Sequence, residues 1–217
     1  FMIDQSTFNS SAENMAYDVS LFNDLNQSGE RFFRIYEWGF TGLTQSEKRS
    51  IPDDLLHFDH SYRLTGGGVV FHSPGDVVFS IGGCLSDSFF PAKSKDLLNW
   101  CSDLFERVLL EMAIPVHKKA ELDIVKNINF CASYFNPYEL YVAGEKIFGF
   151  ALKKTRKHFL IQGVLHIQSS ALFYESIMDR YNSYFTKGMP DLFDFNQFVS
   201  IFEDMLQSRC DNMSHLH

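Results

Sequence analysis

Three successive glycines follow an arginine in the segment Arg63-Leu64-Thr65-Gly66-Gly67-Gly68-Val69-Val70-Phe71-His72. Glycines lack a Cβ atom, so their backbone N–H groups can approach a carboxylate or a phosphate closely. Arg63 is a candidate partner for the same anion, and His72 is a candidate hydrogen-bond donor. The alternatives are a flexible hairpin connection, a surface arginine and a satisfied, half-buried histidine. The spacing therefore indicates either an anion-binding loop or a plain turn.

A lysine and a cysteine later in the chain are the candidates for acyl chemistry. Lys146 lies in Gly144-Glu145-Lys146-Ile147-Phe148-Gly149-Phe150-Ala151, where a strand would partly desolvate its ammonium and direct it at an anion or a carbonyl oxygen. A thiolate at Cys131, close to a lysine, would be an activated nucleophile that accepts an acyl group as a thioester. The alternatives are an edge-strand lysine that blocks aggregation and a buried, inert cysteine.

These two segments resemble, in order and spacing, motifs of the lipoate–protein ligase A family. That family includes octanoyl- and lipoyltransferases and, more distantly, the biotin–protein ligases. Residues 14–18 are similar to the family's N-terminal helix, residues 34–38 to its first core strand, and residues 159–165 to the strand after the lysine motif. The resemblance therefore extends over residues 14–167.

The resemblance implies an α+β fold with a mixed, mainly antiparallel sheet flanked by helices, of the biotin/lipoate–protein ligase catalytic-domain type. We expect a single catalytic domain over residues 8–210, without the small C-terminal accessory domain of many ligases. The resemblance also implies that Lys146 contacts the acyl carbonyl of the bound intermediate. By the same resemblance, a set of seven residues would bind substrate: Arg63, Gly66, Gly67, Gly68, His72, Gly149 and Ala151.

Two reaction routes are consistent with these residues. In the ligase route, lipoate reacts with ATP and Mg²⁺ to give a lipoyl-adenylate, whose phosphate faces the three glycines and Arg63. The acyl group then passes to the acceptor lysine of a lipoyl domain, in a 2-oxoacid dehydrogenase or the glycine-cleavage H protein. In the transferase route, Cys131 takes octanoyl from an acyl carrier protein and passes it to the same acceptor without ATP.

The residues around Cys131 leave these routes open. Pro137-Tyr138-Glu139 stands where the resembling ligases carry Arg-Asn-Asp, and Cys131 lies eight residues before Glu139, as in the cysteine-dependent octanoyltransferases. The triple glycine slightly favours the ligase route, which is our first prediction, with or without a separate accessory subunit. Cys131, Tyr138-Glu139 and the missing accessory domain favour transfer. A third possibility is a non-catalytic relative that binds an acyl group or a lipoyl domain, with its tunnel blocked by Phe148 and Phe150.

Composition excludes several other classes of function. The chain has 217 residues, 45% of them hydrophobic, and a formal net charge of −8, which argues against nucleic acid as the main partner. No apolar run is long enough to cross a bilayer, and no secretory signal precedes the first motif, so we expect a cytoplasmic protein without a membrane partner. The four cysteines show no metal-binding spacing, and we expect no resident metal.

Hydrophobic periodicity and turn residues predict the elements that must position these side chains. Helices are expected over residues 10–23, 93–114, 171–184 and 195–207. Strands are expected over residues 31–38, 69–72, 77–81, 130–142, 146–151 and 159–167. Residues 41–59 are polar and are expected to be irregular.

Overall fold

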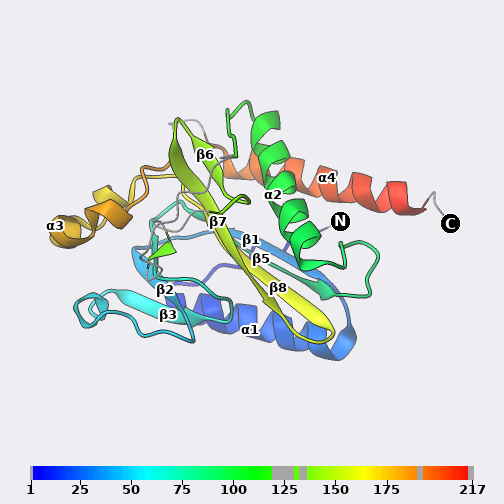
Figure 1. Cartoon of the computed structure of the whole chain (residues 1–217), viewed down its shortest axis with the longest axis horizontal. Helices are drawn as coiled ribbons and strands as arrows, with labels where there is room; N and C mark the ends of the chain where they lie inside the picture. The colour runs from blue at the N-terminus through cyan, green and yellow to red at the C-terminus, as the bar shows by residue number, and fades with distance from the viewer. Residues whose placement is uncertain (1, 119–129, 132–135, 190–192, 215–217) are drawn as a thin grey trace.

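A five-stranded antiparallel sheet is the centre of the molecule (Figure 1). The computed structural model describes residues 2–118, 130–131, 136–189 and 193–214. The strands follow the spatial order β1 (Phe32–Glu37), β5 (Val77–Cys84), β8 (His158–Leu165), β7 (Glu145–Lys154) and β6 (Leu140–Val142). The predicted α+β class, with a mixed and mainly antiparallel sheet, is confirmed.

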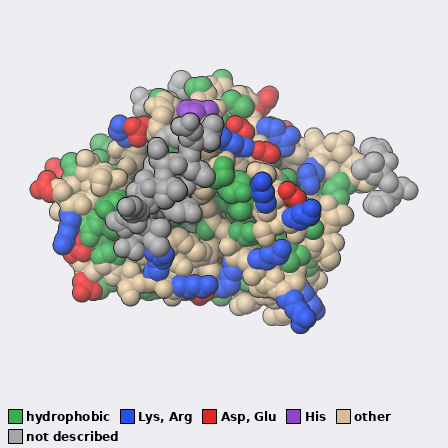
Figure 2. Space-filling view, viewed as in Figure 1, with side chains coloured by type: hydrophobic (Ala, Val, Ile, Leu, Met, Phe, Trp, Pro, Cys, Tyr) green, Lys and Arg blue, Asp and Glu red, His purple; other side chains and the backbone are tan. Residues whose placement is uncertain are grey.

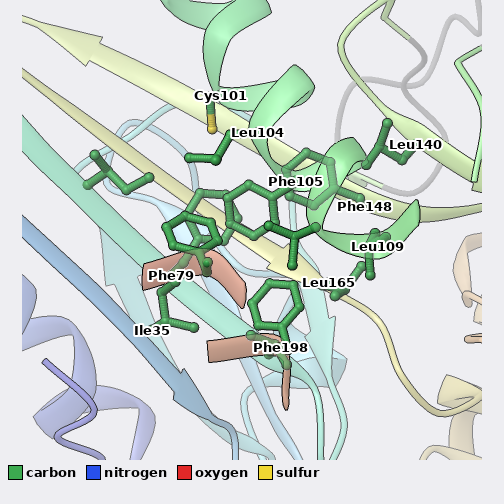
Figure 3. Packing of buried hydrophobic residues seen from close by; sticks show 14 of the residues in the cluster. Ile35, Phe79, Cys101, Leu104, Phe105, Leu109, Leu140, Phe148, Leu165 and Phe198 are labelled. Carbon is green, nitrogen blue, oxygen red and sulfur yellow. The ribbon is translucent and has the colours of Figure 1, made fainter. Parts of the chain in front are cut away.

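Two helices cover one face of this sheet, α2 (Ser94–Glu111) and α4 (Phe195–Ser214). Figure 3 shows the aromatic core between them and the strands. Phe105 of α2 packs against Phe79 and Phe148, with ring centroids 4.3 and 4.7 Å apart, and Phe198 of α4 packs against Phe105 at 5.9 Å. Burial of these large rings supplies much of the favourable free energy of folding.

Helix α1 (Ser11–Ser28) covers the opposite face, against β5 and β8. Ser10 is its N-cap: the Ser10 hydroxyl accepts a hydrogen bond from the Glu13 N–H and donates one to the Glu13 carboxylate. The helix is longer than predicted because it continues until Gly29, whose φ of +77° ends it in the left-handed conformation.

A second, three-stranded sheet packs beside α1, with the order β3 (Asp59–Arg63), β2 (Gly42–Ser46) and β4 (Val70–His72). Strands β2 and β3 are parallel, while β2 and β4 are antiparallel. The expectation that residues 41–59 are irregular was therefore wrong for β2, which is completely buried. Its polar residues are satisfied inside the protein; Thr44, for example, accepts from Arg63 and pairs with His72.

The predicted helix over residues 171–184 was also wrong. The chain forms four short helical turns there, η3 (Ser170–Leu172), η4 (Glu175–Ile177), α3 (Met178–Tyr181) and η5 (Asn182–Tyr184). The buried Tyr174 hydroxyl donates to the carbonyl oxygens of Gly42 (2.5 Å) and His72 (2.7 Å) on the small sheet. Tyr174, Tyr181 and their aromatic neighbours pack on β2 and β4 in one cluster, so tertiary packing overrides helical periodicity here.

The other predicted elements correspond to observed ones, with one shortened. The predicted strand over residues 130–142 is regular only in β6; residues 132–135 lie outside the described residues. Helix α4 begins after Asp194, whose carboxylate caps the helix by accepting from the Gln197 N–H at 3.0 Å. No helix in the described parts of the chain has the length and apolarity needed to span a membrane.

A buried ion pair joins α1 to the large sheet. The Arg34 guanidinium on β1 lies 2.6 Å from the Asp18 carboxylate of α1, and neither side chain is more than 1% exposed. Asp18 also accepts from Ser80 on β5 at 2.5 Å and from Gln162 on β8 at 2.6 Å. Because a buried carboxylate needs compensation, this network fixes the helix to three strands.

We predict that Arg34→Met lowers the free energy of unfolding by about 3–5 kcal/mol, because it leaves the Asp18 carboxylate buried without its cation. The matched control is Arg31→Met, which removes a partly exposed pair with Asp87 and is expected to cost about 1 kcal/mol or less. Urea unfolding of both variants measures the difference. Equal losses would contradict the role given to the buried pair.

Candidate active site

A cavity of about 410 Å³ lies between the large sheet, α1, the small sheet and the glycine loop. Its volume is in the range of small-molecule binding sites. Its lining includes all nine residues that the sequence singled out: Arg63, Gly66, Gly67, Gly68, His72, Cys131, Lys146, Gly149 and Ala151. The structure therefore brings together residues that are up to 88 positions apart in the chain (151 minus 63).

Lys146 on β7 is the central cation of the cavity. Its Nζ atom donates to the Glu139 carboxylate at 2.5 Å and to the backbone carbonyl of Cys131 at 2.8 Å. Both side chains are nearly buried. Burial raises the pKa of the Glu139 carboxyl, while the Lys146 ammonium acts against this shift. The lysine is thus held in one place, directed at the residue that carries the thiol.

Gly149 makes room for this lysine. A Cβ atom at position 149 would lie 3.2 Å from Lys146 Cε and 3.4 Å from Nζ, closer than most side-chain contacts. The glycine three residues after the lysine is therefore explained by sterics, because a larger residue at position 149 would crowd the Lys146 side chain. The lysine side chain passes over the glycine on its way to Glu139.

Arg63 organises the glycine loop from inside. Its Nη2 atom donates to the carbonyl oxygens of Gly66 (2.9 Å) and Gly68 (2.8 Å), and its Nη1 atom donates to that of Thr44 (3.0 Å). Burial lowers the pKa of its guanidinium. Gly66 and Gly67 are exposed, and their N–H groups donate to no described residue. The loop thus presents amides to the cavity side of the molecule, although direct anion binding by Arg63 stays a prediction.

Gly67 is the one glycine of the three with a positive φ, a conformation that other residues adopt only with strain. Its φ is +102°, and a Cβ atom there would lie 2.8 Å from Arg63 Nη2 and 3.0 Å from Cys131 Sγ. The loop, the guanidinium and the thiol therefore meet at this position with no spare volume.

Cys131 places its thiol at this meeting point. The Arg63 Nη2 atom donates to Cys131 Sγ at 3.7 Å, and the Cys131 N–H donates to the Val69 carbonyl at 2.9 Å. The preceding Phe130 stacks on Tyr184 with ring centroids 4.1 Å apart. The cysteine is half-buried and unbridged. A cation beside sulfur stabilises negative charge on it, as a nucleophilic thiolate requires.

His72 is buried beside the loop and is held as a neutral side chain. Burial lowers its pKa well below the ordinary value. Its Nε2 atom pairs with the Thr44 hydroxyl at 2.8 Å, and its ring stacks on Trp38 at 4.3 Å. Its Nδ1 atom finds no partner among the described residues. An unpaired buried nitrogen on a cavity wall is suited to a hydrogen bond with a ligand.

Sequence reasoning missed a second histidine of the cavity. His166 pairs through Nδ1 with the fully buried Asp76 carboxylate at 3.0 Å, and the ring lines the cavity. The period of two along β8 was the available signal, since Gln162, Val164 and His166 share one face of that strand. The contact between His166 and Asp76 joins residues 90 positions apart and depends on tertiary packing.

Phe148 does not block the cavity. It is fully buried in the core on the other face of the sheet, and Phe150 packs its ring on Phe148 and Phe79. Phe150 is among the residues that line the cavity, and Phe148 is not. Among the described residues, no three His, Cys, Asp or Glu side chains gather as ligands for a metal ion.

The fold and the cavity define a chain of the biotin/lipoate ligase structural class. The family model described as "Lipoyl protein ligase A/B catalytic domain" matches residues 10–206, so the chain belongs to this family. No curated protein sequence matches the chain significantly.

Solved structures share the fold at low sequence identity. Protein Ta0514 of Thermoplasma acidophilum, solved with bound lipoic acid, has a TM-score of 0.70 at 14% identity, covering 97% of this chain and 86% of its own. A bipartite lipoate protein ligase of the same organism, described with its E2 lipoyl domain, has 0.63 at 12%, covering 97% and 85%. Lipoate-protein ligase A bound with ATP has 0.57 at 12%, covering 95% of each.

We predict that Gly67→Ala lowers the free energy of unfolding by about 1–3 kcal/mol, because its Cβ atom meets Arg63 and Cys131 in a strained backbone conformation. Gly66→Ala is the matched control: a Cβ atom there meets nothing within 4 Å, and we expect a change near zero. Chemical denaturation of both variants is the measurement. A tolerated Gly67→Ala would mean that the loop is a plain flexible turn.

Proposed function

We propose that the chain catalyses protein lipoylation chemistry, in which an acyl group ends as an amide on the acceptor lysine of a lipoyl domain, and that Cys131 carries the acyl group in transit. The observation that carries this proposal is the surroundings of Cys131: its thiol faces Arg63 and its carbonyl is bound by Lys146, on the wall of one cavity. A buried packing cysteine has no need of two cations.

The transfer consists of two balanced steps. The Cys131 thiolate attacks the carbonyl of an octanoyl thioester on an acyl carrier protein; the carbon–sulfur bond to the carrier breaks, and the carrier thiolate leaves and takes up a proton. The acceptor lysine, as a neutral amine, then attacks the Cys131 thioester. The amide bond forms, the Cys131 thiolate leaves, and the amine's proton is released to a base.

Each step passes through a tetrahedral oxyanion that needs hydrogen-bond donors. The Lys146 ammonium, which donates to the Cys131 carbonyl, and the exposed amides of Gly66 and Gly67 in the same cavity would serve as these donors. His166, oriented by Asp76, is suited to receive the proton of the acceptor amine, because its Nδ1 is occupied and its Nε2 meets no described residue. His72 would form a hydrogen bond through its unpaired Nδ1 atom with the acyl carbonyl or with the molecule that donates the acyl group.

An ATP-dependent lipoate ligase is the second candidate function. The observation that favours it is the glycine loop, whose exposed amides at positions 66 and 67 are also suited to the phosphate of an acyl-adenylate. In this route Cys131 would contribute only packing, and ATP with Mg²⁺ would activate lipoate. Acceptors in both routes are lipoyl domains of 2-oxoacid dehydrogenases or the H protein, acting with a single domain over residues 8–210 or with a separate accessory subunit.

Intact-mass spectrometry of a purified lipoyl domain tests the two candidates. One reaction contains this chain with octanoyl acyl carrier protein and no nucleotide; a second contains lipoate, ATP and Mg²⁺. An octanoyl mass gain only in the first supports the thioester route, and a lipoyl gain only in the second supports the ligase. Modification in neither reaction would favour a binding-only relative and contradict the proposal.

We predict that Cys131→Ser abolishes octanoyl transfer, because a serine hydroxyl stays protonated at neutral pH and is a far weaker nucleophile than a thiolate, and an alkoxide is a poorer leaving group. Cys84→Ser is the matched control, because Cys84 is also half-buried and unbridged but lies outside the cavity. Trapping of the octanoyl group on the enzyme, detected by intact mass, should occur in the control and not in Cys131→Ser. Full transfer by Cys131→Ser would exclude the thioester route.

We predict that Lys146→Met lowers kcat for acyl transfer by about 10²–10³-fold, the typical effect of removing one oxyanion donor. Lys187→Met removes a lysine that is exposed and paired with Glu145, and should leave kcat unchanged. Melting temperatures of both variants check that folding is retained. Wild-type turnover in a folded Lys146→Met would exclude the assigned role.

A further inference from the structure

The turn between β7 and β8 is strongly basic, although the chain as a whole is acidic. Four of the five residues from 153 to 157 are lysine or arginine, in a chain with 27 acidic and 19 basic residues. Lys154, Arg156 and Lys157 are exposed. Figure 2 shows basic side chains gathered over this end of the hairpin, at the lower right. Neighbouring like charges repel, so such a concentration lowers stability unless a partner compensates it.

Contacts of the hairpin extend this basic surface on both sides. Lys154 Nζ donates to the Ser94 hydroxyl at 3.4 Å, which brings in the exposed lysines 93 and 95 that flank Ser94. Lys153 Nζ lies 3.2 Å from the Glu47 carboxylate, which is followed by Lys48 and Arg49. We name residues 48–49, 93, 95, 153–154 and 156–157 the basic band.

The basic band is continuous with the cavity. Arg49 belongs to the cavity lining, and β7 runs from Lys146 at the cavity to Lys154 in the band. A strand rises about 3.3 Å per residue, so these two lysines are roughly 26 Å apart along β7. An acyl chain or a nucleotide in the cavity is too small to reach the far end. A protein domain of about 100 residues, with a radius of gyration of about 13 Å, is large enough.

We propose that the basic band is the docking surface for an acidic face of the acceptor lipoyl domain, placing its lysine at the mouth of the cavity. This inference rests on the proposed function for the identity of the partner. Because the band is positively charged, its partner surface should carry carboxylates. These would pair with the exposed lysines and arginines and raise the rate of association. The whole chain has a net charge of −8 even with the band included, so its surface outside the band is acidic and would repel an acidic face that approached elsewhere.

The test is binding of a fluorescently labelled lipoyl domain of a 2-oxoacid dehydrogenase, measured by anisotropy without any acyl donor, at low and high salt. The variant is Lys154→Glu/Arg156→Glu/Lys157→Glu, which changes exposed side chains only. A charge-preserving variant, Lys154→Arg/Arg156→Lys/Lys157→Arg, is the first control. Arg107→Glu is the second, because Arg107 is also an exposed arginine but lies in the second half of α2.

We expect the triple reversal to weaken binding at least about tenfold at low salt, with the difference shrinking as salt screens the charges. Both controls should bind as the wild-type chain does. Unchanged binding by the triple reversal, an equal loss with Arg107→Glu, or no salt-sensitive binding by the wild-type chain would each overturn the docking proposal.

The same samples separate this proposal from the proposed function. If the wild-type chain binds the lipoyl domain through the band but transfers no acyl group in either mass-spectrometric reaction, docking stands and the proposed catalysis fails. If acyl transfer proceeds and the triple reversal alters neither the dissociation constant nor KM for the domain, catalysis stands and docking at the basic band fails. Octanoyl loading of Cys131 from a small thioester should be equal in all variants.

Discussion

The guanidinium of Arg34 is completely buried, and the first helix supplies most of the groups that compensate its charge. Asp18 supplies the carboxylate, and Asn14 supplies a backbone and a side-chain oxygen at 3.0 and 2.7 Å. Asp18 then holds Gln162 on β8, and Gln162 accepts from Thr65 at the start of the glycine loop, at 3.1 Å. A chain of hydrogen bonds therefore runs from the first helix to the loop that lines the cavity.

Two further buried cations continue this arrangement, and each holds backbone oxygens as well as side chains. Arg63 binds three carbonyl oxygens, which fixes the curvature of the glycine loop. Lys146 binds Glu139 and the carbonyl of Cys131, which fixes the thiol relative to the loop. Because an unpaired buried charge costs several kcal/mol, the alternatives to this geometry are unfavourable. The donors around Cys131 are thus oriented before any ligand arrives.

The sequence predicted which residues come together at the site better than it predicted the secondary structure around them. Motifs with a steric or electrostatic reason, such as Gly67 beside Arg63 and Gly149 beside Lys146, are local and can be read from residue types. The strand β2 was missed because its polar residues are satisfied by partners far away in the sequence. The segment 170–184 has apolar residues at helical spacing, but Tyr174 binds carbonyl oxygens of the small sheet, which no local pattern encodes.

The alternation of side chains along β7 and β8 connects the core to the site. Gly163 leaves space on the core face, where a Cβ atom would lie 2.4 Å from Phe79 and 2.5 Å from Phe150. Gly149 leaves space on the cavity face, for Lys146. A shift of the pairing by one residue would place aromatic rings in the cavity and Lys146 in the core. The packing of the aromatic core therefore fixes the strand register, and the register places the lysine beside the thiol.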